Sequence, residues 1–347
     1  MMVQRGKVPG IQYVVVSPEA TLFEACEGVM DVASGRPVTP ETTFMASSVT
    51  KTLTAVAILQ LHERGALQLS DSLSTYVSTH PYGPDVRLSH LVNQSSGIPN
   101  PMPLRWIHLA ADHDGYDEAE VFRATMAQHT KRSFEPGSKY AYSNLSYWLL
   151  GQVIERVSGM SYAQYMRTQL FDPLGIPSEE MACLIPDATK HACGHLKRWS
   201  LLGLMMPMLM DTSVFDTAAL GRRRIKPVLM NGPAYGGLIG TARAFGVFLQ
   251  DQLRDTSRLL QPETKQLFFS EQSDTRGRTL PTTLGWHRGL LGTTPYYGKP
   301  GGGPGFQSNI RIYPKHRFAS AWLANEAAAS ETAINAVSDA VDQHFLK

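Results

Sequence analysis

Hydrophobic residues form strand-like patterns at both ends of the chain. Residues 11–16 are rich in β-branched side chains, and a second run of strand character covers residues 21–26. Near the other end, residues 309–313 alternate between apolar and polar positions, and residues 318–324 follow after a proline-containing turn. These two segments predict a β-hairpin that ends close to the C-terminus.

Between the strands the apolar period becomes helical. After residue 48, Val49, Thr52, Val56 and Leu59 fit one face of a buried helix that ends at Gly65. The same reasoning predicts helices over residues 48–64, 147–157, 161–170, 241–253 and 328–345.

Strands at both ends with helices between them predict an α/β (α+β) fold. In its simplest arrangement, one antiparallel sheet is built from both termini, flanked by helices, and carries an inserted all-helical domain. We place the sheet domain at residues 1–69 and 234–347 and the helical domain at residues 70–233. A binding site is expected in the cleft between them.

One apolar segment does not fit this scheme. Residues 199–210 read WSLLGLMMPMLM, which is shorter than the roughly 18 apolar residues of a membrane span and contains Pro207. We expect a buried or pocket-lining segment, and the alternative is an apolar lid or a weak membrane contact. Its methionines would suit a pocket for varied acyl groups.

Composition narrows the class of protein. The chain of 347 residues is 43% hydrophobic and 18% charged, and its net charge of +2 is too balanced for a nucleic-acid partner. Its three cysteines do not form a disulfide framework. The N-terminus has no apolar stretch of signal-peptide type, so we expect a cytoplasmic protein, or a periplasmic one if a leader has been removed.

The first candidate for chemistry is Ser48, which lies three residues before Lys51. If Ser48 opens a helix, the Lys51 amine lies one turn further along the same face and can reach the hydroxyl. Serine becomes a good nucleophile only when a neighbouring base takes its proton, and lysine can act as that base if its pKa falls. Taken alone, Ser48 could equally be a helix N-cap.

Two further motifs follow along the chain. Tyr142 and Asn144 precede the predicted helix at 147–157, where a phenol and an amide could be aimed into a cleft, or could simply be a buried tyrosine and a capping asparagine. Lys299 is followed by Pro300 and a run of glycines that includes Gly301 and Gly302. Glycines allow close approach of a ligand to the backbone, although a tight turn has the same composition.

Other catalytic patterns are weaker. The Gly-x-Ser-x-Gly elbow of α/β-hydrolases is absent. His191, Cys193 and His195 alternate and could face one metal ion, but no second group of ligands stands nearby in the sequence, so we expect a structural role and no metal or cofactor.

The three motifs, in the order Ser-x-x-Lys, Tyr-x-Asn, Lys-x-Gly, resemble those of class C β-lactamases, D-Ala-D-Ala carboxypeptidases and, most closely, family VIII carboxylesterases. Their flanks at residues 44–51, 91–99, 134–144 and 236–243 are similar to that family as well. The resemblance implies a β-lactamase/transpeptidase-like fold. It also implies that Ser48 is acylated and that Lys51 and Tyr142 share the general base and acid work.

The resemblance implies roles for the remaining motif residues too. Asn144 orients Lys51 and the substrate, and Lys299 acts electrostatically on Tyr142. Gly301 and Gly302 lie beside the substrate, and the N–H of Gly302 forms an oxyanion hole with that of Ser48. Pro300 departs from the family pattern, which has Thr or Ser there, so a hydroxyl that could bind a substrate carboxylate is lost.

These features predict a serine hydrolase that acts through an acyl-enzyme on a small-molecule ester, amide or β-lactam, with a preference for neutral, apolar acyl esters. One alternative is a D-Ala-D-Ala carboxypeptidase, penicillin-binding protein or β-lactamase proper. Another is a non-catalytic binding or scaffold protein with the same fold.

Overall fold

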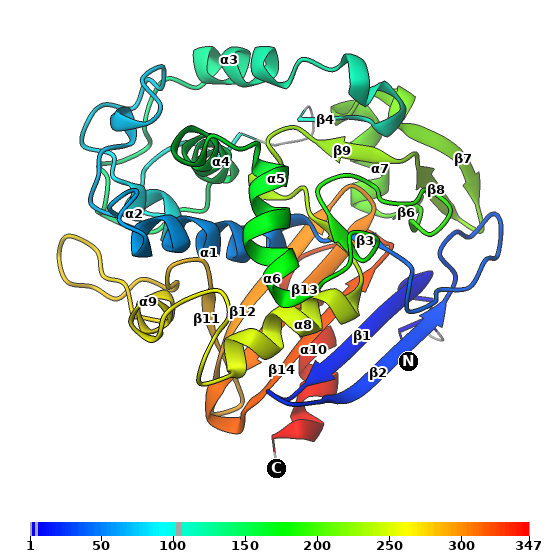
Figure 1. Cartoon of the computed structure of the whole chain (residues 1–347). Helices are drawn as coiled ribbons and strands as arrows, with labels where there is room; N and C mark the ends of the chain where they lie inside the picture. Colours follow the sequence, from blue (N-terminus) through cyan, green and yellow to red (C-terminus); the bar gives the residue numbers. More distant parts are fainter. Residues whose placement is uncertain (1, 4–5, 102–105, 347) are drawn as a thin grey trace.

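The computed structural model describes residues 2–3, 6–101 and 106–346. At its centre lies a six-stranded antiparallel sheet in the order β11-β12-β13-β14-β1-β2 (Figure 1). The strands are β1 Gly10–Val16, β2 Thr21–Gly28, β11 His287–Leu291, β12 Thr294–Gly303, β13 Phe306–Tyr313 and β14 Phe318–Ala324. The two ends of the chain meet where β1 pairs with β14, with Val14 opposite Ala321. The predicted sheet from both termini is confirmed.

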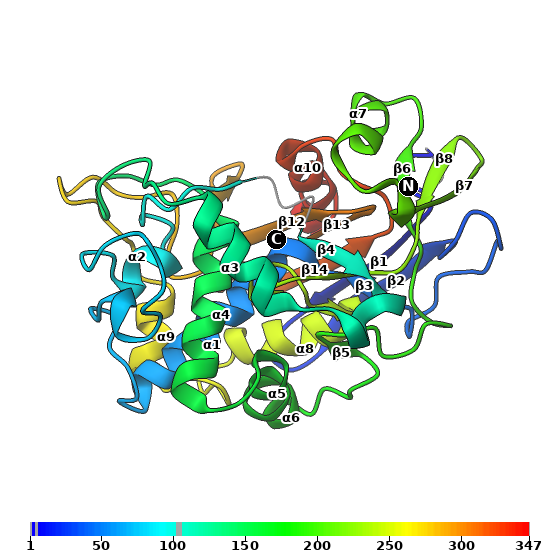
Figure 2. The ribbon, with the colours of Figure 1, turned by 90° about the horizontal axis from the view of Figure 1, so that it is seen from above.

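Helices cover both faces of this sheet. Because strand side chains alternate in direction, Val14 and Val16 join the main core on the side of α8 (Ala242–Leu253). Tyr13 and Val15 point to the other face and pack in the cluster beneath α10 (Glu331–Asp342). Figure 2 shows α8 and α10 on opposite sides of the sheet.

The helix α1 (Thr50–Glu63) passes through the middle of the core and is buried over almost its whole length. It packs against α4 (Asn144–Ser158), which ends at Gly159 in the left-handed conformation, with φ of +70°. Further helices are α2 Leu88–Val92, α3 Glu118–Gln128, α5 Tyr162–Met166, α6 Asp172–Leu174 and α9 Pro262–Phe268. All helices predicted from the apolar period are present.

The insertion differs in detail from the all-helical prediction because it also contains short strands. A three-stranded sheet in the order β6-β8-β7 and a two-stranded pair β4-β9 lie there. A further strand of the insertion, β5, joins two strands from outside it in a small sheet with the order β3-β10-β5. The bounds are β3 Phe44–Met45, β4 Ile107–Leu109, β5 Met181–Ala182, β6 Gly194–Lys197, β7 Phe215–Ala219, β8 Arg222–Ile225, β9 Val228–Met230 and β10 Ile239–Gly240. With two to five residues each, they are too short to show an apolar period.

The apolar segment at 199–210 forms α7 (Leu201–Leu209), which lies mostly at the surface. Trp199, Leu201 and Met208 are exposed by 76%, 76% and 85%, so the prediction of a buried segment is wrong for this face. The opposite face does line a pocket, through Leu202 and the buried Met206. Among the residues described, none of the helices combines the length and the apolar content needed to cross a membrane.

Candidate active site

The nucleophile candidate sits on a short turn before α1. The 3₁₀ turn Ser47–Val49 leads directly into that helix, and Ser47 adopts a left-handed conformation with φ of +49°, which is unusual for a residue with a side chain. Within the fully described stretch 42–61, Ser48 is the one residue that is not buried. The backbone therefore presents a single hydroxyl at the edge of an otherwise closed core.

The Lys51 amine lies beneath that hydroxyl. Its Nζ is 3.2 Å from Ser48 Oγ, 2.7 Å from Asn144 Oδ1 and 2.5 Å from the Tyr235 carbonyl oxygen. Burial, followed by the nearby charge of Lys299, holds the pKa of Lys51 well below its ordinary value. Both effects favour the neutral form of the amine.

When the Lys51 amine is neutral, its two oxygen partners fix the direction of its lone pair. A neutral amine carries two N–H bonds and one lone pair. Asn144 Oδ1 and the Tyr235 carbonyl are acceptors, so each takes one N–H. The remaining contact is with Ser48 Oγ, and the lone pair must therefore point to the serine hydroxyl. This arrangement lets Lys51 accept a proton from Ser48.

The Tyr142 phenol contacts the same hydroxyl from the other side, with 2.6 Å between Tyr142 Oη and Ser48 Oγ. Burial raises the pKa of Tyr142 above its ordinary value. The hydrogen bond with Ser48 acts on this pKa in the opposite direction. Lys51 Nζ and Lys299 Nζ lie 4.9 Å and 5.0 Å from the centre of the Tyr142 ring. The phenol lies between two amines, and a protonated Lys299 can stabilise its anion.

The start of α4 positions this second motif. Ser143 Oγ accepts a hydrogen bond from the N–H of Ser146, and the N–H of Ser143 donates to Gln94 Oε1 at 2.6 Å. Asn144 is the first residue of the helix, so its side chain is aimed at Lys51 from a fixed backbone. Ser143 itself is extended, with φ of −141° and ψ of 118°, so the side chains of Tyr142 and Asn144 on either side of it lie on the same face and reach Ser48 and Lys51.

The third motif lies on β12, which packs against the turn that carries Ser48. A Cβ on Gly301 would lie 2.5 Å from the Ala46 carbonyl oxygen and 3.2 Å from the Ser48 nitrogen, so the strand approaches this closely only with glycine there. Gly302 lines the cavity and has more room, since a Cβ there would meet Ile334 Cδ1 at 3.9 Å. The oxyanion role of Gly302 stays a prediction.

Lys299 is buried on the same strand, next to a partner that no sequence motif marks. Lys299 Nζ lies 2.9 Å from His287 Nε2 on β11, and His287 Nδ1 lies 3.6 Å from Glu331 Oε1 at the start of α10. Burial lowers the pKa of Lys299 to about 7, against an opposing effect of Glu331. His287 carries no local motif, and Glu331 resembles an ordinary acidic helix start, so sequence reasoning missed both.

Ser48, Tyr142, Asn144, His287 and Glu331 line one cavity of about 630 Å³ between the sheet and the insertion. Its apolar wall is formed by Leu202, Met206, Met230 and Ile334. A larger groove of about 960 Å³ runs between α7 and α10 on the outer face of the sheet. That groove shares Leu202, Ala327 and Ala328 with the cavity but is not lined by Ser48 or Tyr142, so the predicted catalytic residues face the smaller space.

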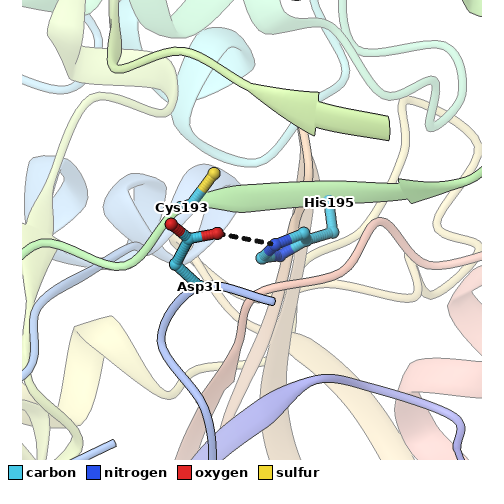
Figure 3. Close-up of side chains that lie close together, drawn as sticks. All are labelled: Asp31, Cys193 and His195. Carbon is cyan, nitrogen blue, oxygen red and sulfur yellow. Dashed lines mark ion pairs between the residues drawn. The ribbon is translucent and has the colours of Figure 1, made fainter. Parts of the chain in front are cut away.

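A separate cluster brings Asp31, Cys193 and His195 together (Figure 3). Asp31 supplies a third group that could not be foreseen, while His191 turns away to Thr43 Oγ1 at 3.1 Å. Asp31 is already paired with Arg224, whose Nε and Nη2 each lie 2.9 Å from one of its carboxylate oxygens.

The other two members of this cluster are also engaged. His195 Nδ1 lies 2.8 Å from the Asn325 carbonyl, and Cys193 Sγ lies 3.4 Å from the Ile225 carbonyl. Burial lowers the pKa of His195 to about 4, so it is neutral at physiological pH. A neighbouring guanidinium disfavours a bound cation, and the donor set fits a structural ion pair better than a metal site.

Comparison with known proteins gives a consistent result. Residues 1–342 match the family model described as Beta-lactamase. Penicillin-binding protein 4* of Bacillus subtilis (strain 168) is 26% identical over 317 residues, which cover 89% of this chain and 66% of that protein. The chain thus spans slightly less than two thirds of that relative.

Solved structures share the fold. The octameric penicillin-binding protein homologue from Pyrococcus abyssi matches with a TM-score of 0.76 and 23% identity over 97% of this chain and 74% of that one. The class C beta lactamase from Rhodobacter sphaeroides matches with a TM-score of 0.74 and 19% identity over 100% of this chain and 97% of that one.

Proposed function

The chain belongs to the Beta-lactamase family, whose members include serine hydrolases, and we propose on that basis that it is a serine hydrolase acting on neutral carboxylic esters with apolar acyl groups. One observation carries the proposal. Ser48 Oγ lies 2.6 Å from the Tyr142 phenol and 3.2 Å from the Lys51 amine, so a nucleophile and two proton carriers share one patch.

The reaction proceeds in two halves. Ser48 Oγ gives its proton to the base and forms a bond with the carbonyl carbon, and the collapse of the tetrahedral intermediate breaks the ester C–O bond. The departing alkoxide takes a proton from the same pair of groups. Water then attacks the acyl-enzyme with the proton steps reversed, which releases the acid and restores the Ser48 hydroxyl.

The surroundings of the cavity favour esters over β-lactams. Penicillins carry a carboxylate, and Pro300 offers neither a hydroxyl nor an N–H to bind it. The charge of Lys299 already faces His287 and Glu331, and the Glu331 carboxylate also lines the cavity and would repel an anion. The apolar wall that includes Leu202 and Met206 suits an uncharged acyl chain instead.

A pair of substrates and a pair of serine variants test the proposal. We expect a larger kcat/KM for p-nitrophenyl butyrate than for nitrocefin, and the reverse order would refute the preference for esters. Ser48→Ala should abolish both hydrolysis and labelling by a fluorophosphonate. Ser47→Ala is the matched control, because Ser47 Oγ is buried without a hydrogen-bond partner among the described residues.

The alternatives predict different outcomes in the same experiment. A penicillin-binding protein or β-lactamase would be labelled at Ser48 by a fluorescent penicillin and would retain or release the label, which intact-mass measurement distinguishes. A non-catalytic scaffold would show no labelling with either reagent. Loss of labelling in Ser48→Ala but not in Ser47→Ala supports the hydrolase.

A further inference from the structure

We propose that His287 and Glu331 are positioning residues that keep Lys299 charged beside Tyr142, so that the site works through a Lys299–His287–Glu331 chain. This inference rests on the proposed hydrolase function. Both residues lie outside the three sequence motifs. His287 begins β11 and Glu331 begins α10.

The chain of contacts runs from the reacting atoms to the mouth of the cavity. Tyr142 Oη contacts Ser48 Oγ, and the Lys299 amine lies over the Tyr142 ring. From Lys299 the contacts continue through His287 to Glu331, whose side chain is 60% exposed. A buried amine is therefore linked through one imidazole to a carboxylate that keeps much of its hydration.

The distances select one tautomer of His287. A charged amine only donates, so Lys299 donates to His287 Nε2, and the ring proton is then on Nδ1, which faces Glu331 Oε1. Burial, followed by the charge of Lys299, lowers the pKa of His287 to about 4, which keeps the ring neutral near pH 7. The contact with His287 lowers the pKa of Glu331, so the carboxylate is ionised. When Lys299 is protonated, the three linked groups are an ammonium, a neutral imidazole and a carboxylate.

A positive charge on Lys299 favours the basic form of both candidate bases, Lys51 and Tyr142, so it assists whichever of them takes the first proton. A charged Lys299 lowers the pKa of Lys51 and so favours the neutral amine. The same charge favours the phenolate form of Tyr142. Tyr140 Oη, 3.4 Å from His287 Nε2, is uncharged because burial raises its pKa to about 12. Among these groups, Glu331 supplies the negative charge that supports Lys299.

The test is the pH dependence of two reactions at Ser48, ester hydrolysis and fluorophosphonate inactivation. Loss of a negative charge lowers the pKa of a neighbouring ammonium, so Glu331→Gln should move the alkaline limb of both profiles to lower pH. We expect a shift of about half a unit, less than the 1 to 3 units typical of an opposite charge within about 6 Å, because the imidazole ring lies between the two groups. Glu331→Asp should restore part of the shift.

Glu271→Gln is the matched control, because Glu271 pairs with Arg288, the neighbour of His287, at 2.8 Å and is not among the residues that line the cavity. It should leave both profiles unchanged. His287→Phe should shift the alkaline limb in the same direction as Glu331→Gln, with thermal unfolding recorded to verify that it folds. An alkaline limb that is the same in Glu331→Gln and the wild type would overturn the inference. A wild type that reacts with neither reagent would instead remove the proposed function.

Discussion

At the scale of single residues, two buried tyrosines near Lys51 differ in the group that their hydroxyl contacts. Tyr142 and Tyr147 both lie within reach of the Lys51 amine, which is 4.9 Å from the centre of the first ring and 5.7 Å from that of the second. Burial raises the pKa of both. Tyr142 Oη contacts Ser48, whereas Tyr147 Oη donates to the Val92 carbonyl at 2.8 Å. Proximity to Lys51 alone does not make a tyrosine a proton carrier.

This difference predicts opposite results for two conservative variants. Tyr142→Phe removes the phenol next to Ser48 and should lower kcat/KM for an ester by about a hundredfold to ten-thousandfold, the usual range for a general acid or base. Tyr147→Phe removes one hydrogen bond in the core and should lower the free energy of unfolding by about 1 kcal/mol with little effect on kcat/KM. Equal losses of activity in the two variants would contradict a proton-transfer role for Tyr142.

At the scale of elements, the site depends on how closely β12 packs against the turn before α1. Ser308 Oγ on β13 donates to the Ala46 carbonyl at 2.7 Å, which ties the sheet to that turn. Gly301 lies over this contact, and a Cβ there would fall 2.4 Å from Ser308 Oγ. The sheet therefore places the strand that carries Lys299 directly against the backbone of Ser48.

Two adjacent glycines test this packing. Gly301→Ala forces β12 away from Ser48, and a displacement of about 1 Å at a reacting centre lowers the rate by about a hundredfold. Gly302→Ala keeps the backbone N–H and meets nothing closer than 3.9 Å, so it should lower kcat/KM much less. The measurement is kcat/KM for the same ester in both variants. A larger loss of kcat/KM in Gly302→Ala than in Gly301→Ala would show that the catalytic rate does not depend on the spacing between β12 and Ser48.

The sequence predicted the elements that carry an apolar period and the residues that carry a motif. The helix that became α4 and the hairpin of β13 and β14 were foreseen because their core positions repeat regularly. The convergence on Ser48 was foreseen from ordered motifs. His287 and Glu331 were not, because 44 positions of chain separate them and only the pairing of β11 with β12 and the packing of α10 bring them together.

At the scale of the whole molecule, one apolar core crosses the boundary between the predicted domains. The main cluster contains Val14 and Leu323 from the sheet, Leu53 from α1, and Trp106 and Trp148 from the insertion. The rings of the last two lie 5.1 Å apart, edge to face. A core that is shared in this way couples the two parts energetically, so neither should unfold alone.

Urea unfolding of two tryptophan variants tests this coupling. In a Trp199→Phe background, replacing Trp286 and Trp322 by Phe leaves Trp106 and Trp148 as reporters of the insertion, and the reciprocal variant reports on the sheet. In each variant the fluorescence midpoint should coincide with the midpoint from far-UV circular dichroism. Midpoints that separate in either variant would mean that the insertion unfolds independently.

The surface position of α7 determines which of its methionines are oxidised first. Met208 is 85% exposed and Met205 is 45% exposed, whereas Met206 between them is buried against the cavity. Peroxide attacks accessible thioethers first, so sulfoxide will form on the outer methionines of α7 before it forms on Met206 in the cavity wall. Each sulfoxide makes the outer helix face more polar, so oxidation will change the surface of α7 before it changes the wall of the cavity.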